Sequence, residues 1–372
     1  MSLPIPDRER LIQLFTQLAM IDGVSLAEGD ISRAVSSRLR QGGLRVVEDD
    51  AGARLRGTAG NLLCFPPDFH PDRPAIMLTA HLDTVLPTTN LKPIVTAERI
   101  SSDGTTILGG DNRLGVSILT SLLLTLTEIH FPHRNFFVAF TVAEEIGLRG
   151  ATAIDLTPYS VQSAFVFDCS RRPGVYIKEC VGLALFNARF IGKAAHAGVA
   201  PEEGINAISL ASAGISKLKM GRVDEETTVN IGRIFGGEAS NVIPDHVEIQ
   251  GEVRSFRKSR IQDQLRYIER TLSEPAVGGG KLVFETKIDF ESYAHSKDAP
   301  IVLEVETALK RVGLSPRPIR YTGGSDANVY NAGGIPAINL GIGAQKPHSL
   351  EEFILLEDLV KSAEIALSLV AP

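Results

Sequence analysis

The 372-residue sequence lacks the features of a membrane, nucleic-acid-binding or disulfide-bonded protein. No apolar run reaches the ~18–20 residues that a membrane-spanning helix needs, and charges among the first ten residues argue against a signal peptide. Lysine and arginine number 38 against 44 acidic residues and form no basic block, which disfavours a nucleic-acid partner. The three cysteines, Cys64, Cys169 and Cys180, fit neither a zinc ribbon nor a CxxC pair. We therefore expect a cytoplasmic protein with no membrane or nucleic-acid partner.

Several catalytic signatures are also missing. The sequence contains no HExxH, GxSxG, GxxxxGK[ST] or GxGxxG motif. Their absence argues against a zincin protease, an α/β-hydrolase, a P-loop NTPase and a dinucleotide-binding enzyme.

The hydrophobic pattern divides the chain into an outer part and an insertion. A single core stops growing near ~250–300 residues, so a chain of this length should form two domains. Apolar runs of strand length at 75–80, 136–142, 164–167 and 336–340 alternate with helical patterns, which indicates an α/β layer structure. Between them, the order strand, helix, strand, strand, helix, strand is typical of a ferredoxin-like fold, with its first helix expected at 202–218. We predict one domain from residues 1–182 and 293–372, and a second from 183–292.

Ligand-type side chains recur where the predicted buried strands end. They are His81 and Asp83 after 75–80, Asp111 in a glycine loop before a helix at 115–129, Glu144 and Glu145 after 136–142, Asp168 after 164–167, and His348 after 336–340. Each one alone would be an ordinary turn, cap or surface residue. In an open α/β sheet, however, ligands bind at the carboxyl ends of the strands. Five such places at one edge predict a binding site.

The residue types point to metal chemistry. Imidazole and carboxylate without thiolate suit zinc, manganese or cobalt. Two histidines and three carboxylates can serve two ions if one carboxylate bridges, with a coordination position left open for water. Adjacent residues in extended backbone point in opposite directions, so one of Glu144 and Glu145 can ligate while the other faces the water. Asp83 shares a face with His81 and can accept a hydrogen bond from the far nitrogen of its ring.

At these positions the chain resembles the dinuclear zinc exopeptidases that include peptidase T, bacterial glutamate carboxypeptidase, aminoacylase and succinyl-diaminopimelate desuccinylase. The matching motifs are Thr79-Ala-His-Leu-Asp-Thr84, Gly109-Gly-Asp-Asn112, Ala143-Glu-Glu-Ile-Gly147, Asp168 and Pro347-His348. Within the group, the segments Asp103-Gly-Thr-Thr-Ile-Leu-Gly-Gly-Asp111 and Ala194-Ala-His-Ala-Gly198 are most similar to peptidase T and its close relatives. The resemblance implies a three-layer α/β catalytic domain of the zinc-exopeptidase type with an inserted ferredoxin-like (βαββαβ) dimerisation domain. It also implies hydrolysis of short peptides by a water held between two metal ions, zinc being expected and manganese or cobalt possible.

The resemblance assigns a role to each ligand-type residue. His81 and Asp168 would hold one metal ion, Glu145 and His348 the other, and Asp111 would bridge them. The peptide bond after Asp111 would be cis.

The remaining roles concern proton transfer and the substrate. Glu144 would be the general base, and Asp83 would support His81. In the inserted domain, His196 would stabilise the oxyanion, often from the partner subunit of a homodimer, and Asn241 and Arg254 would bind polar groups or the carboxylate of the substrate.

Two other functions use the same residues. An N-acyl or carbamoyl amino acid amidohydrolase would attack an amide with the same metal centre. A non-catalytic metal-binding dimer is disfavoured because Glu144, which no metal needs, is present. The sequence leaves open the length and side chains of the peptide, the native metal, the closure of the domains and whether His196 acts across the dimer.

Overall fold

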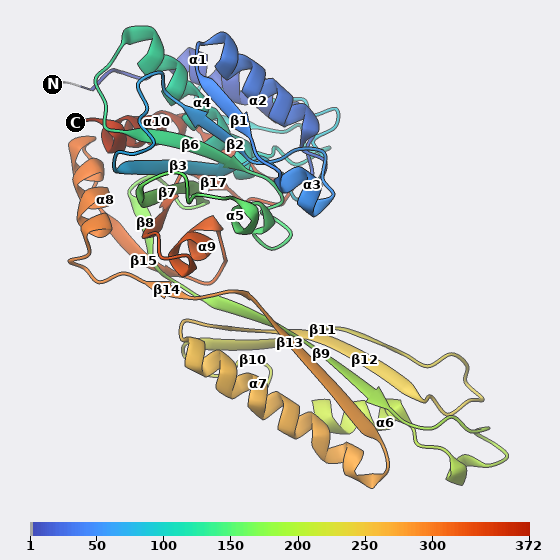
Figure 1. Cartoon of the computed structure of the whole chain (residues 1–372). Coiled ribbons are helices and arrows are strands. Elements are labelled where there is room, and N and C mark those ends of the chain that lie inside the picture. The colour runs from blue at the N-terminus through green and yellow to red at the C-terminus, as the bar shows by residue number, and fades with distance from the viewer. Residues whose placement is uncertain (1–2) are drawn as a thin grey trace. The chain divides into compact units, whose positions relative to one another are not determined.

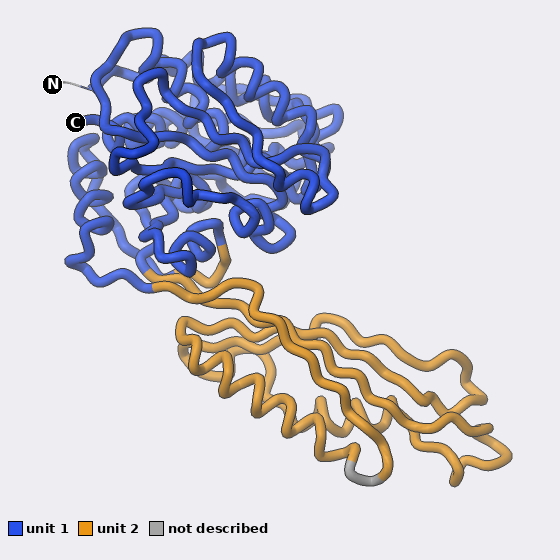
Figure 2. The backbone as a smooth tube through the Cα atoms, viewed as in Figure 1, with its two compact units in different colours: residues 1–178, 294–320, 325–372 blue, residues 179–293, 321–324 orange. Residues whose placement is uncertain are grey.

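The computed structural model describes residues 3–372, apart from the side chains of residues 277 and 278. The chain forms two compact units (Figure 2). The first comprises residues up to 178, 294–320 and 325–372, and the second comprises Glu179–Tyr293 and Tyr321–Gly324. No helix within residues 3–372 is both long enough and apolar enough to span a bilayer.

A nine-stranded sheet forms the centre of the first unit (Figure 1). Its order is β1 (Arg45–Glu48), β2 (Leu62–Phe65), β6 (Phe136–Thr141), β3 (Ala75–His81), β7 (Val161–Cys169), β16 (Ala337–Gly341), β8 (Val175–Cys180) and β14 (Tyr293–Ala294), with β15 (Arg317–Tyr321) beside β8. The central strands β6, β3, β7 and β16 pair in parallel. Continuous apolar sequences such as 136–141 are buried along their whole length, as expected for parallel strands covered on both faces.

Helices cover both faces of this sheet (Figure 1). On one face α4 (Gly110–Ile129) lies against β3 and β7 and contacts α1 (Arg8–Ala19), α2 (Gly29–Gln41) and α10 (Leu356–Val370). Of the helices on this face, α2 also contacts β1 and β2, and α8 (Pro300–Arg311) contacts β16 and α10. On the other face α9 (Asp326–Ala332) contacts β7 and β16, followed by α5 (Arg149–Ala153) and α3 (Ala51–Leu55). A smaller sheet orders β17 (Ala344–Gln345), β18 (Phe353–Leu355), β5 (Arg99–Ser101) and β4 (Ile94–Val95). The predicted three-layer α/β architecture is confirmed.

The second unit is a sheet of five strands in the order β10 (Gly221–Arg222), β11 (Thr227–Gly236), β12 (His246–Ser255), β9 (Gly182–Ile191) and β13 (Lys281–Phe290). Side chains of α6 (Ala207–Ile215) and α7 (Lys258–Ser273) pack with one face of it in a separate apolar core. Short 3-10 turns lie at Pro201–Glu203 and Glu274–Gly278. The predicted ferredoxin-like order of strands and helices is confirmed.

One predicted helix of this unit is wrong in its bounds. The expected helix at 202–218 begins only at Ala207, after the 3-10 turn and an extended segment in which Ile205 pairs with Lys193. The side chain of Asn206 accepts a hydrogen bond from the N–H of Ser209 and so caps the helix. Gly204 itself has extended backbone (φ −91°, ψ 158°) and packs closely against Ile243 and Ala195, so the helix does not include it.

Candidate metal centre

The topology brings three of the predicted positions to one edge of the sheet. His81 is the last residue of β3, Asp168 is near the end of β7, and Glu144 and Glu145 follow β6. Because β3 pairs in parallel with both β6 and β7, the carboxyl ends of the three strands lie side by side. Asp111 comes from the first turn of α4, and its peptide bond to the next residue is cis, as expected.

We call His81, Asp168 and Oδ1 of Asp111 the inner half of the cluster. Nε2 of His81 lies 3.1 Å from Asp111 Oδ1 and 3.2 Å from Asp168 Oδ1. Only 2% of the His81 side chain and 10% of the Asp168 side chain are exposed. Both oxygens of Asp168 also accept hydrogen bonds of 3.2 Å from side-chain amides, one from Asn112 and one from Asn339. The inner half is therefore buried and held from several directions.

We call Glu145, His348 and Oδ2 of Asp111 the outer half. Nε2 of His348 lies 3.0 Å from Glu145 Oε1 and 3.3 Å from Asp111 Oδ2. The His348 side chain is 46% exposed, and its residue has a left-handed φ of 61° in a loop. Glu145 Oε1 is buried and has no hydrogen-bond partner among the described residues, although the imidazole nitrogen is close. Glu145 Oε1 and His348 Nε2 thus lie close together without a hydrogen bond between them.

These donors fit divalent metal ions. Ligand atoms of His81, Asp111 and Glu145 all lie within 4.8 Å of one another. The nearby imidazoles of His348 and His81 outweigh the effect of burial and lower the pKa of Asp111, while the nearby carboxylates of Asp111 and Glu145 raise the pKa of His348 to about 10. Protons on the imidazoles thus offset the carboxylate charge in the metal-free chain. A divalent ion would take the place of those protons.

Glu144 lies beside the inner half. Its Oε2 is 4.0 Å from Nε2 of His81, and 11% of its side chain is exposed. Burial raises the pKa of Glu144 well above its ordinary value; the charge of His81 opposes this shift and that of Asp168 adds to it. A carboxylate with a raised pKa beside a ligand cluster is suited to accept and return a proton.

Asp83 makes more contacts than the single hydrogen bond with the His81 ring that was expected. Nδ1 of His81 makes its hydrogen bond, 3.0 Å long, with the main-chain carbonyl of Asp83, and the carboxylate of Asp83 lies 3.4 Å away. That carboxylate instead accepts hydrogen bonds from the N–H groups of Glu144 and Glu145, at 3.0 and 3.1 Å, and from the hydroxyl of Ser25 at 2.6 Å. Asp83 therefore holds the segment that carries both glutamates as well as the ring of His81.

Two buried acids near the cluster were not expected from the sequence. Glu352 accepts hydrogen bonds from the N–H groups of Gly109 and Asp111, at 2.8 and 3.0 Å, and burial raises its pKa to about 7. Asp326 accepts a 2.6 Å hydrogen bond from the hydroxyl of Thr141, and burial raises its pKa to about 7 as well. The only local signal for Asp326 is that it follows Ser325 at a helix start, where an acid is ordinary; Glu352 has no local signal.

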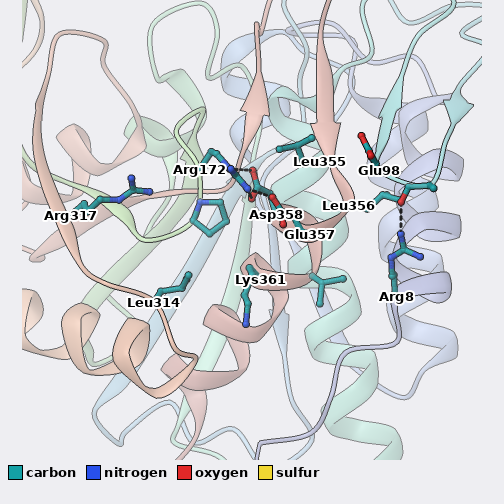
Figure 3. Close-up of a pocket in the computed structure, with 13 residues that line it drawn as sticks. Arg8, Glu98, Arg172, Leu314, Arg317, Leu355, Leu356, Glu357, Asp358 and Lys361 are labelled. Carbon is teal, nitrogen blue, oxygen red and sulfur yellow. Dashed lines mark hydrogen bonds and ion pairs between the residues drawn. The ribbon is translucent and has the colours of Figure 1, made fainter.

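A hollow of about 890 Å³ elsewhere in the first unit does not contain the cluster (Figure 3). The residues that line it include Arg172 and Asp358, which form an ion pair of 2.9 Å. None of the predicted metal or catalytic residues lines this hollow.

The three residues predicted to bind substrate lie in the second unit. The exposed His196 ring accepts hydrogen bonds from the N–H groups of Gly198 and Val199, and the N–H of Ala197 donates to the carbonyl of Asn241. His196 and Asn241 are therefore neighbours.

Arg254 lies apart from that pair. Its guanidinium bonds to both carboxylate oxygens of Glu252 and to the carbonyl of Thr322. It faces Leu183 in the β9–β12 ladder, whereas the loop of His196 follows Ile191 at the other end. Eight residues of strand place the two ends roughly 27 Å apart. Within the second unit of one chain, Arg254 and His196 therefore do not come together.

Comparisons with known proteins agree with this geometry. A family model described as "Peptidase dimerisation domain" matches residues 179–279, and one described as "M42 glutamyl aminopeptidase" matches 96–173. The chain is 34% identical to "Uncharacterized protein YqjE" of Bacillus subtilis, with 98% of each chain covered. Among solved structures it is similar to aminopeptidase PepT of Bacillus cereus (34% identity, TM-score 0.90, 99% of both chains) and to a tripeptidase of Staphylococcus aureus (33% identity, TM-score 0.91, 99% of this chain and 98% of that one).

The chain belongs to the M20 family of dinuclear metal peptidases, close to peptidase T. It is a metal-dependent hydrolase of the exopeptidase type.

Proposed function

We propose that the protein is an aminopeptidase of peptidase T type that removes residues from short peptides with a free amino terminus. The observation that carries the proposal is the position of Asp111, whose two carboxylate oxygens face two different sets of one histidine and one carboxylate. Two divalent ions, with zinc the expected metal, would be held by His81 and Asp168, by Glu145 and His348, and by Asp111 in common. Bound there, the ions supply a Lewis acid that polarises a carbonyl and acidifies water.

In this proposal the protein's own groups carry the proton. Glu144 takes a proton from the water that attacks the peptide carbonyl and delivers it to the leaving amine as the C–N bond breaks. Its carboxylate is available for that role because it makes no hydrogen bond to the imidazole of His81, from whose Nε2 its Oε2 lies 4.0 Å away. Asp83 keeps Glu144 and Glu145 in place through their N–H groups.

The second unit supplies the remaining part of the proposal. The match to a peptidase dimerisation domain supports a homodimer, which we place in the cytoplasm. Arg254 and His196 lie at opposite ends of the strands, so one second unit does not bring the predicted substrate-binding residues together. We therefore propose that His196 and Asn241 serve the site of the partner subunit.

The test is a substrate panel combined with one substitution. Tripeptides, dipeptides and N-acyl amino acids are assayed with zinc, manganese or cobalt, and turnover of free-amino tripeptides is expected while N-acyl compounds remain intact. Glu144→Gln should keep both ions by elemental analysis and lower kcat by about 10²–10⁴-fold, the usual contribution of a general base. Preferred hydrolysis of N-acyl amino acids would instead identify an amidohydrolase, and unchanged kcat in the variant would refute the mechanism.

A further inference from the structure

Glu28 is a fully buried acid that the chemistry above does not use. It precedes α2, yet its side chain makes no hydrogen bond to that helix. Its Oε1 instead accepts hydrogen bonds from the N–H of Leu26 at 2.9 Å and from the N–H of Ala143 at 2.8 Å. One oxygen therefore joins the loop before α2 to the residue that immediately precedes Glu144.

Both residues that donate to Glu28 have unfavourable backbone. Leu26 has φ 69° and Ala143 has φ 52°, a left-handed conformation that residues other than glycine rarely adopt. Such a conformation persists only where the surroundings enforce it. At Ala143 it determines how the chain turns from β6 into the two glutamates, and the hydrogen bond to Glu28 opposes its relaxation.

Two buried carboxylates together bind three consecutive N–H groups. Glu28 takes that of Ala143, and Asp83 takes those of Glu144 and Glu145. Every main-chain donor from Ala143 to Glu145 thus ends on a carboxyl oxygen of a buried acid.

A buried cation accompanies these acids. Arg113 is 0% exposed, and its Nη2 donates to the carbonyl of Ile21 at 3.2 Å. The charges of Asp83 and Glu28 act on it. Its Nε and Nη1, and Oε2 of Glu28, are buried and have no hydrogen-bond partner among the described residues. Arg113 offsets the negative charge that the N–H acceptors place beside the metal ligands.

We infer that Glu28 is a positioning residue, which holds the left-handed turn at Ala143 and thereby directs Glu144 towards the substrate and Glu145 towards the metal. The inference rests on the proposed role of Glu144 as the general base. The hydrogen bonds of the Glu28 side chain among the described residues go to main-chain N–H groups and not to ligand side chains, so its removal should affect the chemical step more than substrate binding or metal content.

The experiment compares three substitutions at this position in the metal-loaded protein. Glu28→Ala removes the acceptor, and Glu28→Asp keeps the charge but shortens the reach by one methylene. Each should lower kcat by about 10–100-fold, as loss of a supporting hydrogen bond does at metal sites, with two ions still bound and KM within about twofold. Glu28→Gln retains a carbonyl oxygen that can accept both N–H groups, and its kcat should stay within about threefold of the wild type.

Val35→Ala is the matched control, because it removes buried side-chain volume from the same helix without touching the carboxylate. It should lower the thermal midpoint and leave kcat unchanged. The inference is overturned if Glu28→Ala and Glu28→Asp turn over at the wild-type rate, or if their loss is matched by Val35→Ala or by missing metal. If Glu28→Ala does not fold, the comparison of Glu28→Asp with Glu28→Gln decides, and equal kcat values overturn the inference. Glu144→Gln is assayed alongside to distinguish failure of this inference from failure of the proposed function. Normal turnover of that variant refutes the proposed function itself.

Discussion

The inner and outer halves of the cluster share Asp111 and have the same ligand types, but they are built differently. His81 is 2% exposed at the end of a central strand, whereas His348 is 46% exposed in a loop. Asp168 receives hydrogen bonds from two asparagine amides, whereas Glu145 Oε1 has no hydrogen-bond partner among the described residues. The inner half is therefore fixed by the fold before any ion binds, and the outer half depends more on the ion itself.

This difference suggests how the centre works. With the proposed ions bound, a rigid inner half would retain its ion while an accessible outer half would admit substrate and solvent. Supporting hydrogen bonds around ligands commonly set both affinity and orientation.

The largest effect is expected where the two halves meet. Asp111→Ala removes the group that faces both histidines, so both ions should be lost and turnover should fall by at least about 10⁴-fold, more than loss of a general base alone. Elemental analysis after gel filtration measures the metal content. Retention of one tightly bound ion would show that the inner half needs no bridging carboxylate.

A smaller and unequal effect is expected from the two histidines. His81→Ala and His348→Ala should each leave one ion bound, but only the first creates a cavity, because His348 is half-exposed. We expect His81→Ala to lower the free energy of unfolding of the metal-free chain by about 2–5 kcal/mol, as other deletions of large buried side chains do, and His348→Ala to lower it less. Urea denaturation of both variants measures this, and equal losses would contradict the proposed asymmetry.

The smallest effect is expected from a residue that supports a ligand. Asn339→Ala removes one amide from Asp168 and should weaken the tighter metal-binding step by about 10-fold. Asn331→Ala is its control, because in the described part of the chain that amide bonds to main-chain groups of Ala327 and Ala337 and to no ligand. Competition with a chelator measures both affinities. If the two variants are equally weakened, the amide on Asp168 has no specific effect on the metal.

Much of the fold follows from local patterns. Runs such as 136–141 are apolar throughout because parallel strands are covered on both faces, so their position and type could be predicted. The α6 helix was predicted too long, since a close contact of Gly204 and a cap at Asn206 outweigh the apolar periodicity of 202–218.

The supporting acids could not be predicted in this way. Glu28 and Ala143 are 115 residues apart, and Glu352 and Gly109 are 243 apart, so no local pattern connects them. A glutamate outside a helix or strand is usually solvated, and nothing in the residues next to Glu28 or Glu352 shows that these two are buried.

The sequence by itself determined which ligand types stand at the ends of which strands, because strand direction in a parallel sheet brings those ends to one edge. Three features follow from the packing of the folded chain: which half is buried, the hydrogen bond of His81 Nδ1 to a main-chain carbonyl, and the three N–H groups through which Glu28 and Asp83 hold the glutamates. Hydrogen bonding and burial depend on groups that meet only when distant segments pack together, and residue order alone does not specify those meetings.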